Sequence, residues 1–370
     1  MATPLLRTGR VIQVLARRAG AKWVLVEVQG RQEKAICYEH WCGEIAVGDR
    51  VLLNVAAVHM GLGTGGHHFV VADLDNPERD VPGNPRAMKA RYTPTQVPVL
   101  TVEEDPRYRE QITRFRSLGG MPVVLTCVHS HLGAFLVALR ALGGEGLRTA
   151  AVLTDSGALP AALSDLLATL RERRLVDSVI TTGQAFGGDY ETVNVYTGLI
   201  AAREIAEAQV AVVGGGPGHL GTGTRFGFSC IDLGEAARAA EVLGGQVVFL
   251  PRLGYADPRP RHRGLSHHSL TLMRDVIADR VTVVLPSLSG DERDSLEKQV
   301  AAEGLSARHD LLYRNGAFIE AALRECGFPV LHMGRTFADD PAFYHAAGAA
   351  ARYVVELLGN RGRPTGRGSE

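Results

Sequence analysis

The sequence has few lysines and no apolar run long enough to cross a membrane. Lysine occurs only at Lys22, Lys34, Lys89 and Lys298, so arginine carries most of the positive charge and no lysine is expected near the loops after the later strands. A membrane-spanning helix needs about 20 apolar residues, and no such run is present. The start of the chain lacks the apolar segment and cleavage site of a signal peptide. We therefore expect a cytoplasmic protein without membrane association.

Cysteine and net charge are also low. The five cysteines are an odd number scattered along the chain, which favours reduced thiols over a disulfide framework. Cys37, His40 and Cys42 lie close together, but no second cysteine pair completes a tetrahedral metal site, so we interpret these cysteines as strand residues. The 40 basic residues balance 40 acidic ones, so no global field attracts nucleic acid.

The N-terminal part of the sequence alternates apolar and polar residues. Short alternating runs fill residues 9–74 and are separated by glycine-rich turns, a pattern that predicts five strands. We expect a small β-barrel domain over residues 1–78. An oligonucleotide-binding barrel would carry a basic groove, whereas residues 1–75 hold eight Lys and Arg against seven Asp and Glu. Nucleic acid is therefore an unlikely partner.

The rest of the chain is typical of a large α/β domain. We expect residues 79–120 to form a connector with an extended segment and a short helix, because the beginning of this segment is rich in Pro, Asn and Arg. Over 121–358, up to eight Val-, Ile- and Leu-rich runs alternate with helical segments. Such runs indicate a parallel sheet buried on both faces, so we expect a Rossmann-like three-layer fold, with a closed βα barrel as the alternative. Residues 359–370 are expected to be a disordered tail.

Polar residues follow several of the predicted strands. The segment after the first strand holds His129, the segment after the second holds Asp155, and the segment after the third holds Asp189. Parallel sheets gather their sites at the carboxyl ends of the strands, so we expect these residues to share one cleft. Asp155 and Asp189 are candidates for a general base or metal ligands. Simple solvation of the loops is the alternative, and for Asp155 a turn or a helix cap.

Two glycine-rich segments match the pattern G-x-G-x-x-G. One is "GLGTGG" at 61–66, and the other opens "GPGHLGTGTRFGFS" at 216–229. A dinucleotide site needs a strand, a tight turn and an immediate helix, and neither segment has this context, so NAD is not an expected cofactor. We expect the second loop to bind an anion through backbone N–H groups and side chains. The residues assigned to this role are Gly216, Gly218, His219, Gly221, Thr222, Gly223, Thr224 and Arg225. The alternative is a loop whose backbone passes close to another segment, such as 61–66.

The segment "RHRGLSHHS" concentrates cationic and imidazole side chains. Ser266 is the expected N-cap of a helix that carries His267 and His268 in its first turn. Arg261, His262 and Arg263 precede it. We expect this segment to bind an anion and the two first-turn imidazoles, with pKa values lowered by the helix dipole, to act as bases or ligands. Helix capping and solvated charge are the alternative.

A metal site is a further hypothesis. His129 and His131 leave a predicted strand as H-x-H, which resembles the first-strand histidines of amidohydrolases. The likeness covers three residues, the lysine of that family is absent, and its other ligands are not found in order. Polar loop lining is the alternative, and a divalent metal is left open as a cofactor.

Six motifs together resemble one family along nearly the whole chain. They are "GDRVLLNVAAVHMGLGTGG", "MKARYTP", "TDSGALPAALSDL", "GQAFGGDYETVNVYTGL", "GPGHLGTGTRFGFS" and "ADPRPRHRGLSHHSLT". This combination resembles a bacterial family of unknown function, number 3866. The resemblance implies a bacterial context without a mechanism. The family pattern has no histidine at the position of His131, which argues against a metal site there.

These observations favour an enzyme, a hydrolase or group transferase, for a phosphorylated or anionic small molecule such as a nucleotide or sugar phosphate. The glycine loop and residues 261–266 would hold the anion, and acid, base or metal ligation would come from His129, Asp155, Asp189, His267 and His268. Two alternatives stay open: a non-catalytic metabolite-binding or regulatory protein, and a metal-dependent hydrolase. The sequence leaves a homo-oligomer open as well.

Overall fold

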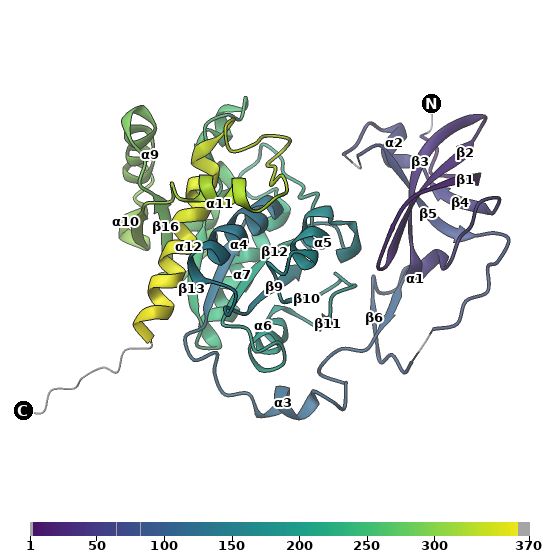
Figure 1. Ribbon diagram of the computed structural model, residues 1–370, viewed down its shortest axis with the longest axis horizontal. Helices are drawn as coiled ribbons and strands as arrows, with labels where there is room; N and C mark the ends of the chain where they lie inside the picture. The colour runs from purple at the N-terminus through teal and green to yellow at the C-terminus, as the bar shows by residue number, and fades with distance from the viewer. Residues whose placement is uncertain (1–2, 64, 82, 362–370) are drawn as a thin grey trace, which may run out of the picture.

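The alternating N-terminal residues form a closed β-barrel. A computed structural model describes residues 3–63, 65–81 and 83–361. The barrel strands follow the order β1-β2-β3-β5-β4, and Figure 1 shows the barrel beside the larger domain. Their bounds are β1 Leu6–Arg18, β2 Ala21–Val28, β3 Arg31–Tyr38, β4 Arg50–Asn54 and β5 His67–Asp73. Two one-turn helices, α1 Glu39–Cys42 and α2 Ala56–His59, interrupt this series.

The structure corrects the expectation of reduced thiols at one place. Cys37 and Cys42 form a disulfide, with their Cα atoms 6.1 Å apart. Cys37 lies in β3, but Cys42 ends the one-turn helix α1, so the turn brings the two sulfur atoms together in a way that two positions on one extended strand would not. Cys127, Cys230 and Cys326 are free.

The barrel contacts the large domain at a turn that precedes helix α5 (Asp165–Glu172). Ala162 and Leu163, in the 3₁₀ turn Ala161–Leu163, pack with a group of barrel residues around Tyr38. Arg18 forms an ion pair with Asp165 at 2.5 Å and donates a hydrogen bond to the carbonyl of Leu163. The barrel is therefore attached to the large domain by apolar and charged contacts.

The connector contains a small hairpin and the expected short helix. The hairpin strands are β6 Ala87–Lys89 and β7 Val97–Val99, and the helix is α3 Arg109–Arg114. Lys89 corrects the expectation that no lysine lies near the later loops: its Nζ donates to the carbonyl oxygens of Thr181 and Ala185 and forms an ion pair with Glu191 at 2.6 Å. This buried ammonium fixes the connector to the sheet domain.

The large domain has the expected three-layer α/β fold. Its sheet has the order β11-β10-β9-β12-β8-β13-β16-β17, and every pairing is parallel. The strands are β8 Pro122–Thr126, β9 Thr149–Thr154, β10 Ser178–Thr181, β11 Tyr190–Glu191, β12 Val210–Gly215, β13 Gln246–Leu250, β16 Thr282–Pro286 and β17 Asp310–Arg314. Because β11 and β17 are edges, the sheet is open and the closed βα barrel is wrong. The run "PVLHM" is not one of these strands; β11 is the eighth.

Helices cover both faces of the sheet because its strands are apolar on both sides. In β8, Val123 and Leu125 face one core and Val124 faces the other. The first core receives α6 Val195–Glu204, α7 Leu233–Val242, α9 Gly290–Ala302 and α10 Leu305–Arg308. The second core receives α4 His129–Gly143, α5, α11 Ile319–Glu325 and α12 Pro341–Arg361. Residues 359–361 thus belong to a helix and not to the expected tail, and 362–370 lie outside the described residues.

The chain reverses its winding direction at the centre of the sheet. After β8 it enters α4 on one face, whereas after the neighbouring strand β12 it continues toward α7 on the opposite face. Loops that diverge in this way leave a crevice at the carboxyl ends of the strands. None of the helices in the described part of the chain is long and apolar enough to span a membrane.

Candidate functional site

The main cavity lies at this crevice, beyond the carboxyl ends of β8, β12 and β13. Its volume is about 450 Å³. Its lining is apolar in part and rich in imidazole, and none of the described lining residues is acidic. The polar and sulfur-containing side chains are Cys127, His129, Ser130, His219, Cys230, Arg252, Arg259, His262, His268, His332 and Met333. Several expected site residues are therefore brought together from three different loops.

His129, directly after β8, has both ring nitrogens occupied by protein groups. Nδ1 lies 3.0 Å from the carbonyl oxygen of Gly215, and a carbonyl only accepts, so Nδ1 carries the proton. Nε2 then accepts a hydrogen bond from the Ser164 hydroxyl at 2.6 Å. Burial lowers the pKa of His129 to about 4. His129 is thus a neutral imidazole held as part of the cavity wall.

Two other cavity histidines also contact hydroxyl groups. His332 Nδ1 lies 2.9 Å from Ser130 Oγ, and the His332 ring stacks on Phe343. His219 Nε2 lies 3.5 Å from Ser156 Oγ. Burial lowers the pKa of His332 to about 3 and that of His219 to about 4. These imidazoles are neutral near pH 7 and are oriented by their neighbours.

A cluster of three histidines, His262, His267 and His268, lies at the β13 side. The ring centroids of His267 and His268 are 4.0 Å apart, and the His262 centroid lies 5.0 and 5.3 Å from them. Nε2 of His267 and Nε2 of His268 are both buried and have no hydrogen-bond partner. Buried polar atoms are rarely left unsatisfied, so these two nitrogens mark a place where a ligand can bind.

Burial is the main cause of the low basicity of the histidine cluster. Burial lowers the pKa of His262 to about 3 and of His268 to about 4, and nearby arginines add to both shifts. Burial also lowers the pKa of His267. Helix α8 (His267–Thr271) is only five residues long and leads into a π-helical turn at Leu272–Val276. Ser266 is the N-cap as expected, but its side chain makes no capping bond; its Oγ contacts Nδ1 of His262 at 2.8 Å instead.

The glycine loop after β12 makes room for protein groups. A Cβ on Gly221 would come 2.6 Å from Cε1 of His268, and a Cβ on Gly216 would come 2.6 Å from the carbonyl oxygen of Ala158. The second contact confirms a close backbone approach, although the partner is the segment after β9 and not residues 61–66. Of the eight loop residues expected to bind an anion, Gly218, His219 and Gly221 line the cavity.

The outer part of that loop is occupied by its own contacts. Thr222 N and Oγ1 both donate to the carbonyl of Gly227, and the Thr222 and Thr224 hydroxyls lie 2.8 Å apart. Arg225 forms a bidentate ion pair with Asp275. These contacts occupy this part of the loop, and its role in anion binding stays a prediction. The other five expected loop residues do not line the cavity, and neither do Arg261, Arg263 and Ser266; the five are Gly216, Thr222, Gly223, Thr224 and Arg225.

Two arginines that the sequence analysis did not select supply the positive charge of the cavity. Arg252 Nη2 and Arg259 Nη2 each lie 2.8 Å from Asp257 Oδ2, and Arg335 lies 3.8 Å from the same oxygen. The hydrogen bond from Arg259 is the main cause that holds the pKa of Asp257 far below its usual range. One carboxylate thus faces three guanidinium groups, which leaves an excess of positive charge.

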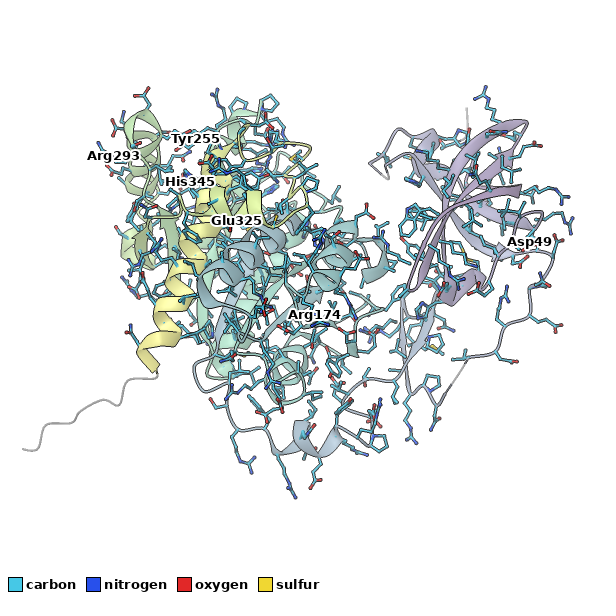
Figure 2. The ribbon with its side chains drawn as sticks, viewed as in Figure 1. Asp49, Arg174, Tyr255, Arg293, Glu325 and His345 are labelled. Atoms are coloured by element: carbon cyan, nitrogen blue, oxygen red, sulfur yellow. A yellow bond between two sulfur atoms is a disulfide. The ribbon has the colours of Figure 1, made fainter. Side chains whose placement is uncertain are left out.

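The loop that carries these arginines is anchored at Tyr255. Figure 2 labels Tyr255 on the side of the domain near α9, away from the barrel. Its hydroxyl donates to the carbonyl of Glu292 at 2.6 Å, and its backbone N–H donates to Asp340 at 2.9 Å. Both contacts fix the loop between Arg252 and Arg259.

The two expected aspartates lie elsewhere. Asp155 accepts a hydrogen bond from the Gln184 N–H and lines a separate hollow of about 130 Å³ together with Asp232 and Glu235. Asp189 pairs with Arg171 and accepts from the backbone N–H of Val179, and it lines neither hollow. The expectation of one shared cleft therefore fails for both carboxylates, because the loops after β9 and β10 lie farther along the sheet edge.

His131 belongs to the core. It is 0% exposed and stacks on Phe343 with ring centroids 4.1 Å apart. His129 lines the cavity, whereas His131 does not. Both residues lie in the first turn of α4 and not at the end of an extended strand. Side chains two positions apart on a helix point in different directions, so His129 reaches the cavity and His131 the core. The structure therefore does not present an H-x-H pair to one ion.

Some lining residues had a weak sequence signal. Arg252 is the second residue after β13, Cys127 and Ser130 lie within two residues of His129, and His332 follows a short apolar run near the C-terminus. Cys230 lies in an irregular segment between β12 and α7, and no local pattern marks it. A rule that takes the first polar residue after each strand would have found Arg252.

The fold and the cavity place this chain among doubly wound parallel α/β proteins with an added β-barrel. Its particular family follows from the sequence: residues 34–351 match the family described as "Protein of unknown function (DUF3866)", and the chain belongs to that family. No curated protein matches the chain. The function must therefore be argued from the cavity itself.

Proposed function

We propose that the protein is an enzyme, a hydrolase or group transferase, that binds a phosphorylated or otherwise anionic small molecule in the main cavity. The observation that carries this proposal is the pair of buried, unpartnered Nε2 atoms on His267 and His268. They belong to a cluster that reaches the cavity at His262 and His268, where guanidinium groups are also present. Perturbed titratable groups in a concave pocket are typical of functional sites.

The excess charge around Asp257 favours an anionic ligand. Arg252 is buried, and its pKa is lowered by that burial, while Arg259 is more accessible. A guanidinium binds phosphate or carboxylate through paired N–H donors. An anion that entered the cavity would relieve the repulsion between these two arginines, which share a single carboxylate.

The imidazoles supply the reactive groups. A neutral imidazole with a free Nε2 accepts a proton from water or a substrate hydroxyl and can return it to a leaving oxygen, which typically accelerates a reaction by about 10² to 10⁴. His268 is the candidate closest to this role because it lines the cavity. Whether water or a second substrate accepts the transferred group distinguishes a hydrolase from a transferase.

A panel of sugar phosphates, nucleotides and dicarboxylates tests the proposal, with turnover and binding both measured. Arg259→Gln should weaken anion binding about 10- to 100-fold, since a hydrogen bond to a charged group is worth about 1.5–3 kcal/mol. The matched control is Arg225→Gln, which removes a guanidinium that pairs with Asp275 outside the cavity lining.

The outcomes separate the alternatives. Binding that weakens in the Arg259 variant, without turnover of any compound, would identify a metabolite-binding protein instead of an enzyme. If both arginine variants lose affinity equally, or if no anion binds, the main cavity is not the anion site.

A further inference from the structure

Three imidazoles converge without any carboxylate beside them. One ligand atom from each of His262, His267 and His268 lies within 4.8 Å of the other two, and no other group of three His, Cys, Asp or Glu residues in the described chain meets this condition. The described lining of the adjoining cavity contains no Asp or Glu. Mg²⁺ and Ca²⁺ prefer oxygen ligands, whereas imidazole suits Zn²⁺ and its neighbours in the periodic table.

We propose that His262, His267 and His268 bind one divalent transition-metal ion, with Zn²⁺ as the best-matched ion. Three protein ligands and one open position are the arrangement of catalytic zinc sites. The cluster lies at the edge of the main cavity, so the open position would face the space where the anionic molecule is proposed to bind.

The surroundings hold two of the three rings in place. Ser266 Oγ contacts Nδ1 of His262, and the His268 ring stacks on Phe228 at 4.4 Å between centroids. Ligand histidines are commonly oriented by such contacts to the nitrogen that does not bind the metal.

The unpartnered nitrogens are the independent observation that points to a ligand. Nε2 of His267 and Nε2 of His268 are buried and make no hydrogen bond in the protein. Leaving a buried polar atom unsatisfied costs about 1–3 kcal/mol, and one ion between these rings would satisfy both. A tetrahedral zinc ion with Zn–N distances of 2.0–2.1 Å holds its nitrogens about 3.3 Å apart, so rotation of the side chains would complete the site.

The charges nearby predict the fourth ligand. Three imidazoles leave the 2+ charge of the ion unneutralised, and Arg252 and Arg259 add to the positive potential. The open position would therefore take hydroxide, phosphate or carboxylate. With the ion bound, Nε2 of His268 is a metal ligand and not the proton acceptor, so the metal would instead polarise the bound anion or activate water. This role of the metal rests on the function proposed above, but the site itself does not.

Metal binding to the full chain can be measured without a substrate. The protein is stripped with a chelator, loaded with Zn²⁺ or Co²⁺, and examined by elemental analysis, calorimetry and visible absorption of the cobalt form. We expect one ion per chain. His268→Asn and His262→Asn should each weaken Zn²⁺ binding at least tenfold, whereas His219→Asn, a cavity histidine outside the cluster, should leave it unchanged. Melting curves of the metal-free proteins confirm that each variant folds, and His267→Asn replaces any that does not.

The metal-binding measurements have outcomes that support the proposed site and outcomes that overturn it. Addition of inorganic phosphate should alter the cobalt spectrum if the fourth position is open to the cavity. A thiolate-to-cobalt band that disappears in Cys127→Ser would place the ion on the cavity thiols and overturn the proposal. Zn²⁺ affinity that is equal in wild type and His268→Asn would overturn it as well. Turnover by a protein that binds neither Zn²⁺ nor Co²⁺ would refute this site but not the proposed function, whereas one tightly bound ion without turnover would support the site and contradict the function.

Discussion

The histidines on the two sides of the main cavity differ in the hydrogen bonding of their ring nitrogens. At the β8 side, both nitrogens of His129 are occupied, by Gly215 and Ser164, and His332 is held by Ser130. At the β13 side, Nε2 of His267 and Nε2 of His268 have no partner. All of these residues are histidines of low pKa near one opening. Burial and lowered basicity therefore do not by themselves identify a reactive histidine. An unmet hydrogen bond is informative only beside the cavity, because the core residue His131 also has two unpartnered ring nitrogens.

The largest difference in turnover should be found between two variants in which a single histidine is replaced, one on each side of the cavity. His268→Asn should reduce turnover about 100-fold or more, because it removes either a proton-transfer group or a metal ligand. His129→Asn should instead leave turnover within a few-fold and lower the free energy of unfolding by about 1–3 kcal/mol, since it leaves buried partners unsatisfied. Steady-state kinetics and denaturant titration of the two variants test this contrast. Equal losses of turnover would show that both sides take part in the reaction.

A smaller effect is expected from crowding the reactive side. In Gly221→Ala the new methyl group would lie 2.6 Å from Cε1 of His268 and displace the ring. A displacement near 1 Å is enough to reduce a rate by about 10- to 100-fold. Gly223→Ala is the matched control, because nothing lies within 4 Å of a Cβ at that position and neither glycine has a positive φ. The kinetics of the two alanine variants would be indistinguishable if the position of His268 were irrelevant.

The smallest expected effect is on the pH dependence of stability and comes from the core residue His131. Burial holds the pKa of His131 well below its usual value of 6.5. The unfolded chain therefore takes up a proton that the folded protein does not, so stability is fully present above about pH 6.5 and decreases as the pH falls, by at most about 1.4 kcal/mol per pH unit. His131→Leu should flatten this decrease. Urea titrations between pH 7 and pH 5 measure it, and parallel slopes for wild type and variant would contradict the assignment.

Much of the fold could be predicted because a strand that is buried on both faces consists almost entirely of apolar residues. Runs such as "MPVVLTCV" and "AQVAVVGG" are apolar at nearly every position, as a strand covered on both faces requires. The barrel was recognised from its alternation. The predictions fail where a local pattern is short: "PVLHM" is not a strand, β11 has only two residues, and Cys42, expected in a strand, ends a one-turn helix and pairs with Cys37.

The site could be predicted only in part because chain order does not give the spacing between strands. β8, β12 and β13 are neighbours in the sheet, so His129, His219 and Arg252 meet. The loops that carry Asp155 and Asp189 follow β9 and β10, which lie farther from the centre. A rule based on strand ends therefore selects the correct edge of the sheet but not which loops share a cavity. Both ring nitrogens of His129 have hydrogen-bond partners, whereas Nε2 of His268 has none, and the sequence gives no sign of this difference.

The contact between the barrel and the turn before α5 gives the small N-terminal unit a structural influence on the cavity. Ala162 and Leu163 are covered by barrel side chains, and Ser164, the next residue, is hydrogen-bonded to His129. A chain shortened to the large domain alone would uncover these apolar residues and loosen the hydroxyl that orients one wall of the cavity. The barrel therefore supports the turn that carries one hydrogen-bond partner of the cavity wall, and the full chain is the suitable form for the measurements above.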